Sequence, residues 1–210
     1  ADKDIESEEP YMPICKPKTG KKIAVVGAGP SGLSAAYYSA INGHRVTGFE
    51  SQPKAGGMMQ YCIPSYRLPK NTLDKEIEQI TKLGVKIQTG KAVGVHMHLE
   101  DIQKDFDAVY LGIGSSTANT LKLEGDRARG VWLGIAFLER IAKGVNVELG
   151  ESVVVIGGGN TAIDCARTAL RREGVKKVIL VYRRTKDEMP AESYEIEEAL
   201  EEGVEMRFLV

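Results

Sequence analysis

Cysteine is scarce in this chain, and none of its three cysteines lies near another. Cys15, Cys62 and Cys165 are far apart in the sequence and form no C-x-x-C pair. This spacing excludes a disulfide framework, and it provides no zinc or iron–sulfur site within the chain itself. A thiol–disulfide reductase is also not expected, because such enzymes use paired cysteines. The pattern favours a protein of the reducing cytoplasm.

Long apolar runs and blocks of like charge are missing as well. No stretch approaches the roughly 18 consecutive apolar residues that a membrane-spanning helix needs, and the N-terminus, Ala1-Asp2-Lys3-Asp4, is mostly charged, unlike a secretory signal. The formal net charge is −1, so neither a nucleic-acid surface nor a polybasic membrane anchor is expected. No Ser/His/Asp motif of a hydrolase appears.

Two weaker features have ordinary explanations. His96 and His98 could share one face of a strand as a metal pair, but no carboxylate or cysteine stands at ligand spacing. We therefore predict two exposed histidines and no metal site. The strongly acidic helix expected over 192–202 could dock a basic partner, although a solvated acidic face is the more common outcome.

Glycine is abundant, with 23 residues, and it clusters where strands should end. The expected elements are a strand over 23–26, a helix over 31–41 and strands over 45–49, 85–87 and 108–111, with a helix over 73–83 between them. The same plan restarts with a strand over 153–156, a helix over 161–171 and a strand over 178–181. We predict an α/β fold of two Rossmann-like units with parallel sheets, the second inserted after the first. The predicted limits are an arm over 1–20 and domains over 21–125 and 126–210.

The first glycine turn has the G-x-G-x-x-G form. Gly27-Ala28-Gly29-Pro30-Ser31-Gly32 follows a strand and opens a helix, where backbone N–H groups at the helix N-terminus can bind a pyrophosphate. Glu50 ends the next strand, and an acidic side chain there can accept hydrogen bonds from ribose hydroxyls. The pattern predicts a dinucleotide with free ribose hydroxyls, as in FAD.

The second glycine turn follows the same logic with a different strand end. Gly157-Gly158-Gly159-Asn160-Thr161-Ala162 opens the second helix, and Arg183 and Arg184 stand where the first unit has Glu50. A guanidinium group can pair with a 2′-phosphate, which a carboxylate would repel. The second site is therefore predicted to prefer NADP(H) to NAD(H).

Four further segments make the pattern more specific than two Rossmann turns. They are Ala55-Gly56-Gly57, Tyr61-Cys62-Ile63-Pro64-Ser65-Tyr66-Arg67-Leu68-Pro69-Lys70, Asp107-Ala108-Val109-Tyr110-Leu111-Gly112-Ile113-Gly114 and Met189-Pro190-Ala191. From about Lys21 to Arg207, the chain resembles the small (beta) subunit of NADPH-dependent glutamate synthase. The same module occurs in the N-terminal part of dihydropyrimidine dehydrogenase and in electron-bifurcating transhydrogenase subunits.

The resemblance implies that NADPH gives a hydride to FAD and that electrons leave through iron–sulfur clusters to a partner subunit. It implies FAD contacts at Gly27, Gly29, Pro30, Ser31, Gly32, Glu50, Gly57, Arg67, Leu68 and Val93, and NADPH contacts at Gly157, Gly159, Asn160, Thr161, Arg183 and Arg184. Val93 is expected in a strand, near the adenine. The chemistry would belong to the flavin, so no side chain is named as a general acid or base. Glutamate synthase, other dehydrogenases and bifurcating complexes all use this module, which leaves the final electron acceptor open.

The chain also departs from the family pattern. The family has a cysteine-rich N-terminal domain, whereas only Cys15 lies in that region here, so the clusters are expected in a missing domain or in a partner. A late Gly-Asp segment that holds the flavin is absent before Val210, and Cys62 replaces an expected glycine. We therefore expect a fragment or truncated relative that holds FAD weakly and self-associates. The alternative is a non-catalytic dinucleotide-binding module or scaffold fragment.

Overall fold

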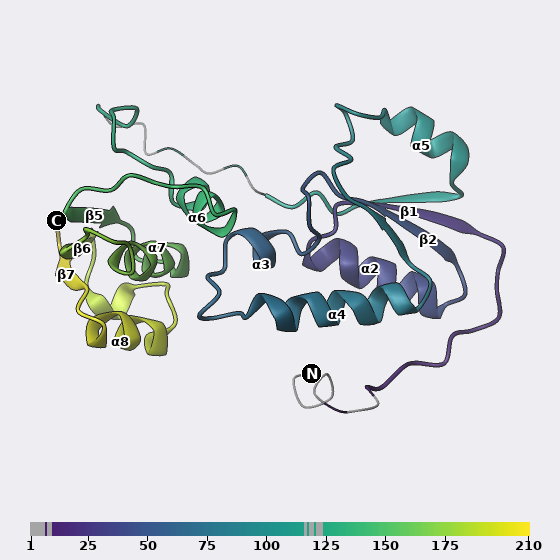
Figure 1. Cartoon of the computed structure of the whole chain (residues 1–210), viewed down its shortest axis with the longest axis horizontal. Helices are drawn as coiled ribbons and strands as arrows, with labels where there is room; N and C mark the ends of the chain where they lie inside the picture. Colours follow the sequence, from purple (N-terminus) through teal and green to yellow (C-terminus); the bar gives the residue numbers. More distant parts are fainter. Residues whose placement is uncertain (1–6, 8–9, 116, 118–119, 121–123) are drawn as a thin grey trace. The chain divides into compact units, whose positions relative to one another are not determined.

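The computed structural model describes residues 7, 10–115, 117, 120 and 124–210. Contacts divide the chain into two compact units, Ala1–Ser115 and Ser116–Val210. Each unit has its own parallel sheet with its own helices (Figure 1). This architecture confirms the α/β fold with two Rossmann-like units. The predicted domain limits at 21–125 and 126–210 stay a prediction.

The first unit is built on a four-stranded parallel sheet with the strand order β3-β2-β1-β4. Its elements are β1 (Lys22–Val26), α2 (Pro30–Ile41), β2 (Arg45–Phe49), α3 (Met58–Tyr61), α4 (Lys70–Lys82), β3 (Lys86–Gln88), α5 (Leu99–Asp105) and β4 (Ala108–Leu111). The strands and helices predicted in this unit agree with these bounds to within a few residues. The short helices α3 and α5 were not predicted.

Helices cover both faces of this sheet. Val25 of β1 is buried against Ala36 of α2. Ala24 and Val26 point the opposite way along the same strand and pack with Ile102 of α5. Because both faces are covered, β1 reads in the sequence as an uninterrupted apolar run.

The second unit has a three-stranded parallel sheet with the order β5-β6-β7. Its elements are α6 (Gly134–Ala142), β5 (Ser152–Ile156), α7 (Asn160–Leu170), β6 (Lys177–Tyr182), the 3₁₀ helix η1 (Lys186–Glu188), α8 (Ser193–Glu201) and β7 (Glu205–Phe208). The helix α6 was not predicted. The core lies on one face of the sheet, where Leu180 packs with Ile163 of α7. On the other face, Val154 and Ile156 are 58% and 62% exposed.

The stretch after β3 differs from the prediction. β3 ends at Gln88, so the strand expected to contain Val93 is wrong; Val93 instead forms an isolated bridge with Met97. Gly94 turns the chain there with a φ of +88°, a conformation that side-chain-bearing residues rarely adopt. The short helix α5 then follows.

The two histidines of this stretch do not share a strand face either. The Nδ1 atom of His96 accepts a hydrogen bond from the Ala92 N–H at 3.0 Å. His98 is the N-cap residue of α5, and Glu100 and Asp101 follow in the first turn of that helix. Acidic side chains at a helix N-terminus favour the helix, which begins directly after His98.

The acidic helix α8 packs against α7 through charge pairs. Arg167 of α7 contacts Glu198 and Glu202 at 2.6 Å, and Arg171 contacts Glu202 at 2.6 Å. The Arg167 side chain is only 6% exposed, and Glu195 of α8 is fully buried. The other acidic residues of the helix are exposed, as expected for a solvated acidic face.

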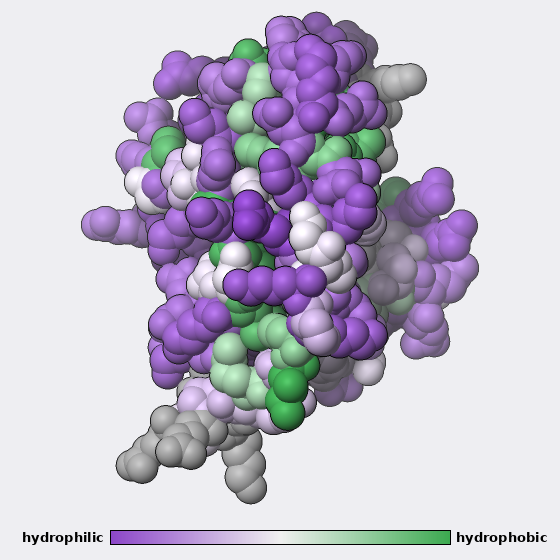
Figure 2. All heavy atoms as spheres, turned by 90° about the vertical axis from the view of Figure 1, so that its right-hand side faces the viewer, coloured by the Kyte–Doolittle hydropathy of each residue, from purple (hydrophilic) through white to green (hydrophobic). Residues whose placement is uncertain are grey.

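No helix in the described part of the chain is both long and apolar enough to cross a membrane. Figure 2 shows one face of the molecule, on which hydrophilic side chains predominate and hydrophobic ones occur in small separate patches.

Candidate functional site

Two glycines of the first turn are required by the packing of the chain itself. Gly27, between β1 and α2, has a φ of +94°, and a Cβ atom there would lie 2.3 Å from the carbonyl oxygen of Gly112. A Cβ atom on Gly32 would lie 1.8 Å from the carbonyl oxygen of Gly27. Both positions therefore exclude a side chain whether or not a ligand is present.

Gly29 is different, because neither its conformation nor its packing requires glycine. Its φ of −81° is open to any residue, and the nearest atom to an added Cβ would be the Gly57 Cα, at 3.7 Å. Gly29 is the N-cap residue of α2, whose N-terminus has no side-chain cap and no acidic residue in its first turn. The backbone N–H groups at this helix N-terminus have no side-chain cap, and Gly29 has no side chain to block a ligand, so the site suits a pyrophosphate.

Glu50 is joined to this turn by hydrogen bonds. Its side chain follows β2 and is 5% exposed. The Ala28 N–H donates to Oε2 and the Gln52 N–H donates to Oε1, each at 2.8 Å. A carboxylate oxygen can accept two hydrogen bonds, so Oε2 retains capacity for a ribose hydroxyl.

The structure brings two further predicted residues to the same turn. Gly57 has a φ of +53°, and its added Cβ would lie 2.8 Å from the Gly29 Cα, so the two backbones are in close contact. The hydroxyl of Ser31, in the first turn of α2, forms a 2.7 Å hydrogen bond with the hydroxyl of Tyr110. Tyr110 comes from β4, which lies beside β1 as in a Rossmann-like sheet, and it was not among the predicted site residues.

The remaining predicted residues of the first unit lie on loops. Arg67 and Leu68 are half-buried in a turn before α4, where both backbone N–H groups donate to the Pro64 carbonyl. Val93 packs beside Phe49, the last residue of β2.

The second turn repeats the geometry of the first. Gly157 has a φ of +145° and an added Cβ would lie 3.1 Å from the Ala162 Cβ; at Gly158 it would lie 2.6 Å from the ring of Tyr182. Gly159 again has an ordinary φ of −94°, and the nearest atom to its added Cβ, on Pro190, is 3.9 Å away. α7 starts there without a side-chain cap or an acidic first turn.

The segment that contains the Met189-Pro190-Ala191 motif is hydrogen-bonded to this turn. The Ala191 N–H donates to the Gly158 carbonyl at 3.1 Å, and the Glu192 N–H donates to the Asn160 Oδ1 at 2.9 Å. The Tyr182 hydroxyl donates to the Glu188 carbonyl at 3.0 Å. Tyr182 was missed in the sequence, although it directly precedes the two predicted arginines. Thr161 lies exposed in the first turn of α7.

Arg183 and Arg184 follow β6, as Glu50 follows β2 in the first unit. Both are exposed, and among the described residues neither guanidinium forms an ion pair. The chain then turns through a capping box in which the N–H and hydroxyl of Thr185 donate to Glu188. These two hydrogen bonds hold the pKa of Glu188 below its usual value, and the nearby Arg184 acts in the same direction. This strand end presents two cations to an anionic ligand.

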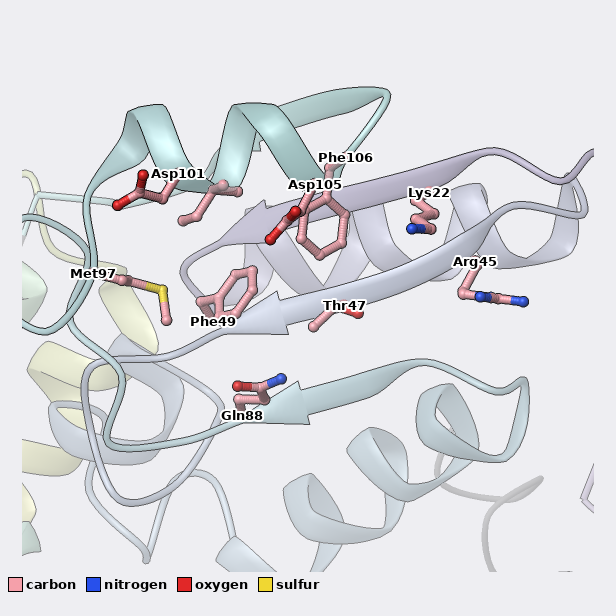
Figure 3. A pocket seen from close by; sticks show the side chains of 10 residues that line it. Lys22, Arg45, Thr47, Phe49, Gln88, Met97, Asp101, Asp105 and Phe106 are labelled. Atoms are coloured by element: carbon pink, nitrogen blue, oxygen red, sulfur yellow. The ribbon is translucent and has the colours of Figure 1, made fainter.

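A separate pocket of about 470 Å³ lies under α5, on the face of the first sheet opposite α2 (Figure 3). Asp105 extends from α5 toward the sheet, and the lining from β2 includes Arg45, Thr47 and Phe49. None of the predicted cofactor-binding residues lines this pocket. Within the described residues, no group of three or more His, Cys, Asp or Glu side chains could hold a metal ion.

Comparison with known proteins gives a consistent family. The sequence pattern of the pyridine nucleotide-disulphide oxidoreductases matches residues 21–209. The NADP(+)-dependent formate dehydrogenase subunit beta of Moorella thermoacetica is 46% identical over 91% of this chain, and the glutamate synthase [NADPH] small chain of Escherichia coli is 38% identical over 92%. The resemblance to the glutamate synthase small subunit is thereby confirmed.

The chain spans only part of these relatives. It covers 27% of the formate dehydrogenase subunit and 43% of the glutamate synthase small chain. The solved structure of FprA from Mycobacterium tuberculosis in complex with NADPH superposes with a TM-score of 0.77 and 22% identity, covering 88% of this chain and 48% of that one. This structural similarity shows that the two chains share the fold.

Proposed function

Because the chain belongs to the pyridine nucleotide-disulphide oxidoreductase family, we propose that it is the FAD- and NADPH-binding part of a flavin-dependent NADPH oxidoreductase. FAD is assigned to the first glycine turn and NADPH to the second. The residues proposed to contact FAD are Gly27, Gly29, Pro30, Ser31, Gly32, Glu50, Gly57, Arg67, Leu68 and Val93. Those proposed to contact NADPH are Gly157, Gly159, Asn160, Thr161, Arg183 and Arg184.

One observation carries the assignment of the two ligands. Both turns have an uncapped helix N-terminus and a middle glycine, Gly29 or Gly159, that the chain does not need for its own packing. The turns differ in the residue that ends the next strand. A buried carboxylate, Glu50, favours free ribose hydroxyls, whereas the exposed Arg183 and Arg184 favour a 2′-phosphate.

When bound, FAD supplies the redox chemistry, accepting a hydride from NADPH and passing electrons onward. The residues of the chain bind and orient the two nucleotides. We further propose that the electrons pass to iron–sulfur centres in another domain or in a partner subunit. The names of the relatives support a partner, since one is a subunit beta and another a small chain.

The proposal is tested by titrating the chain with FAD and NADPH, first singly and then with one held at saturation. Two independent sites are expected, so saturating FAD should leave the affinity for NADPH unchanged. Competition for a single site would contradict the proposal. Anaerobic addition of NADPH to the FAD-loaded chain should then bleach the visible absorbance of the flavin. Two sites without bleaching would instead support a non-catalytic binding module.

A further inference from the structure

Lys70 stands at a position that is locally unfavourable for a cation. It is the first residue of α4, and no acidic residue occurs in the first turn of that helix. The N-terminus of a helix carries a partial positive charge, which repels an ammonium group. Helix-forming tendency therefore does not explain a lysine here, and a tertiary role is indicated.

The ammonium group binds the backbone of another segment. Its Nζ atom donates to the Met59 carbonyl at 2.5 Å and to the Ile63 carbonyl at 2.6 Å. Burial lowers the pKa of Lys70, while neighbouring Cys62 and Asp74 act in the opposite direction. Partial loss of water around an ammonium group is unfavourable unless carbonyl oxygens replace it, and two of them do so here.

Met59 lies within α3, and Ile63 lies two residues after the last residue of that helix. α3 is a single helical turn, and the carbonyls at the end of a helix have no partners within it. Its N-cap residue, Gly57, is in close contact with Gly29 of the first glycine turn. Lys70 thus caps the far end of a short helix whose near end lies against the proposed pyrophosphate site.

The turn that Lys70 closes contains two proposed flavin contacts. Ile63 precedes Pro64, whose carbonyl accepts hydrogen bonds from the N–H groups of Arg67 and Leu68. We infer that Lys70 is a positioning residue: it fixes the segment from α3 to α4 and thereby holds Arg67 and Leu68 for the flavin half of FAD. This inference rests on the proposed function of the first site.

The test compares FAD with ADP, which lacks the flavin half and reports only on the glycine turn and Glu50. Lys70→Met removes the donor, Lys70→Arg retains one, and Lys75→Met is a control at an exposed lysine of the same helix. Lys70→Met should weaken FAD binding by about tenfold or more, as expected for the loss of charge-assisted hydrogen bonds. ADP binding should be unchanged. Lys70→Arg should restore much of the FAD affinity, and Lys75→Met should behave as the wild type.

Hydrogen exchange of the ligand-free chain gives a second readout. Amides of residues 62–68 should exchange faster in Lys70→Met than in the wild type or Lys70→Arg. Unchanged exchange in this segment, or an equal loss of FAD and ADP affinity, would overturn the inference. A wild-type chain that binds FAD no more tightly than ADP would overturn the proposed flavin site as well. A wild type with a clear FAD preference that Lys70→Met retains would overturn only the role of Lys70.

Discussion

The Oε2 atom of Glu50 accepts a hydrogen bond from the backbone N–H of Ala28 at 2.8 Å. The acidic residue that ends β2 therefore also secures the turn that follows β1. The sequence indicates a ribose-binding acid at this position, whereas the structure adds a second role in shaping the pyrophosphate turn. A substitution of Glu50 affects both roles, so the choice of replacement matters.

Glu50→Ala should weaken binding of both FAD and ADP by about 10–100-fold. A hydrogen bond to a charged group contributes on the order of 1.5–3 kcal/mol, and the turn loses its anchor as well. Glu50→Gln retains one acceptor oxygen, so its loss of affinity should be smaller. Isothermal titration with FAD, ADP and NADPH measures all three affinities. NADPH binding should not change; if NADPH alone is weakened, the two sites are assigned in reverse.

The glycines of the first turn should respond differently to the same substitution. Gly29→Ala should leave the fold intact and weaken FAD binding at least about tenfold, because the new methyl group occupies the space left for the ligand. Gly32→Ala should unfold the first unit or prevent its folding. Alanine is favoured over glycine within a helix by about 1 kcal/mol, but its Cβ at 1.8 Å from the Gly27 carbonyl oxygen outweighs this gain.

Thermal unfolding followed by circular dichroism, together with FAD titration, distinguishes these two outcomes. Gly159→Ala provides the matched test in the second unit, where NADPH binding should fall and stability should not. If Gly29→Ala binds FAD as the wild type does, the open space beside Gly29 has no role in binding.

The sequence predicts β1 well because its sheet is covered on both faces there, which requires a short apolar run, and because Gly27 follows it. The G-x-G-x-x-G motif itself assigns Gly29 to close approach of the pyrophosphate and Gly32 to close packing of the helix. The coordinates add the distances: a Cβ on Gly29 would make only an ordinary contact with Gly57 at 3.7 Å, whereas a Cβ on Gly32 would lie 1.8 Å from a carbonyl oxygen. The hydrogen bond between Ser31 and Tyr110 was not predicted, because a Rossmann-like strand order places β4 beside β1 but does not say which of its side chains reaches α2.

The errors occur where tertiary contacts outweigh local pattern. Val93 was expected in a strand, but Gly94 turns the chain there and α5 follows, whose seven residues provide too few positions for a helical periodicity to appear. The pairing of Arg167 of α7 with two acidic residues of α8 was not predicted, because these residues lie far apart in the sequence.

NADPH should bind the chain more tightly than NADH. Arg183→Ala and Arg184→Ala should each weaken NADPH binding by about 10–100-fold, the effect expected for one charge-assisted phosphate contact. NADH binding should barely change, since that ligand has no 2′-phosphate. Arg129→Ala, at another exposed arginine of the second unit, is the control. Equal affinity of the wild type for the two nucleotides would contradict the role given to both arginines.

The stability of the second unit should depend on the charge of Glu202. Hydrogen bonds from Arg171 and Arg167 hold the pKa of Glu202 at about 2, against an ordinary value of 4.5. The folded protein thus prefers the carboxylate, and this preference stabilises the fold fully above pH 4.5 and is lost as the pH falls from 4.5 toward 2. The carboxylate is 25% exposed, so after allowance for solvent screening the contribution at neutral pH is on the order of 2 kcal/mol.

Glu202→Gln should therefore lower the free energy of unfolding at pH 7 by about 2–4 kcal/mol, because it also leaves the buried Arg167 with one fewer charged partner. The difference from the wild type should shrink steadily as the pH is lowered from 5 to 2. Urea unfolding followed by circular dichroism at several pH values measures it, and Glu201→Gln, at the exposed neighbouring position, should show little change. A wild-type advantage that persists undiminished at pH 2 would mean that packing, and not the charge of Glu202, joins α8 to α7.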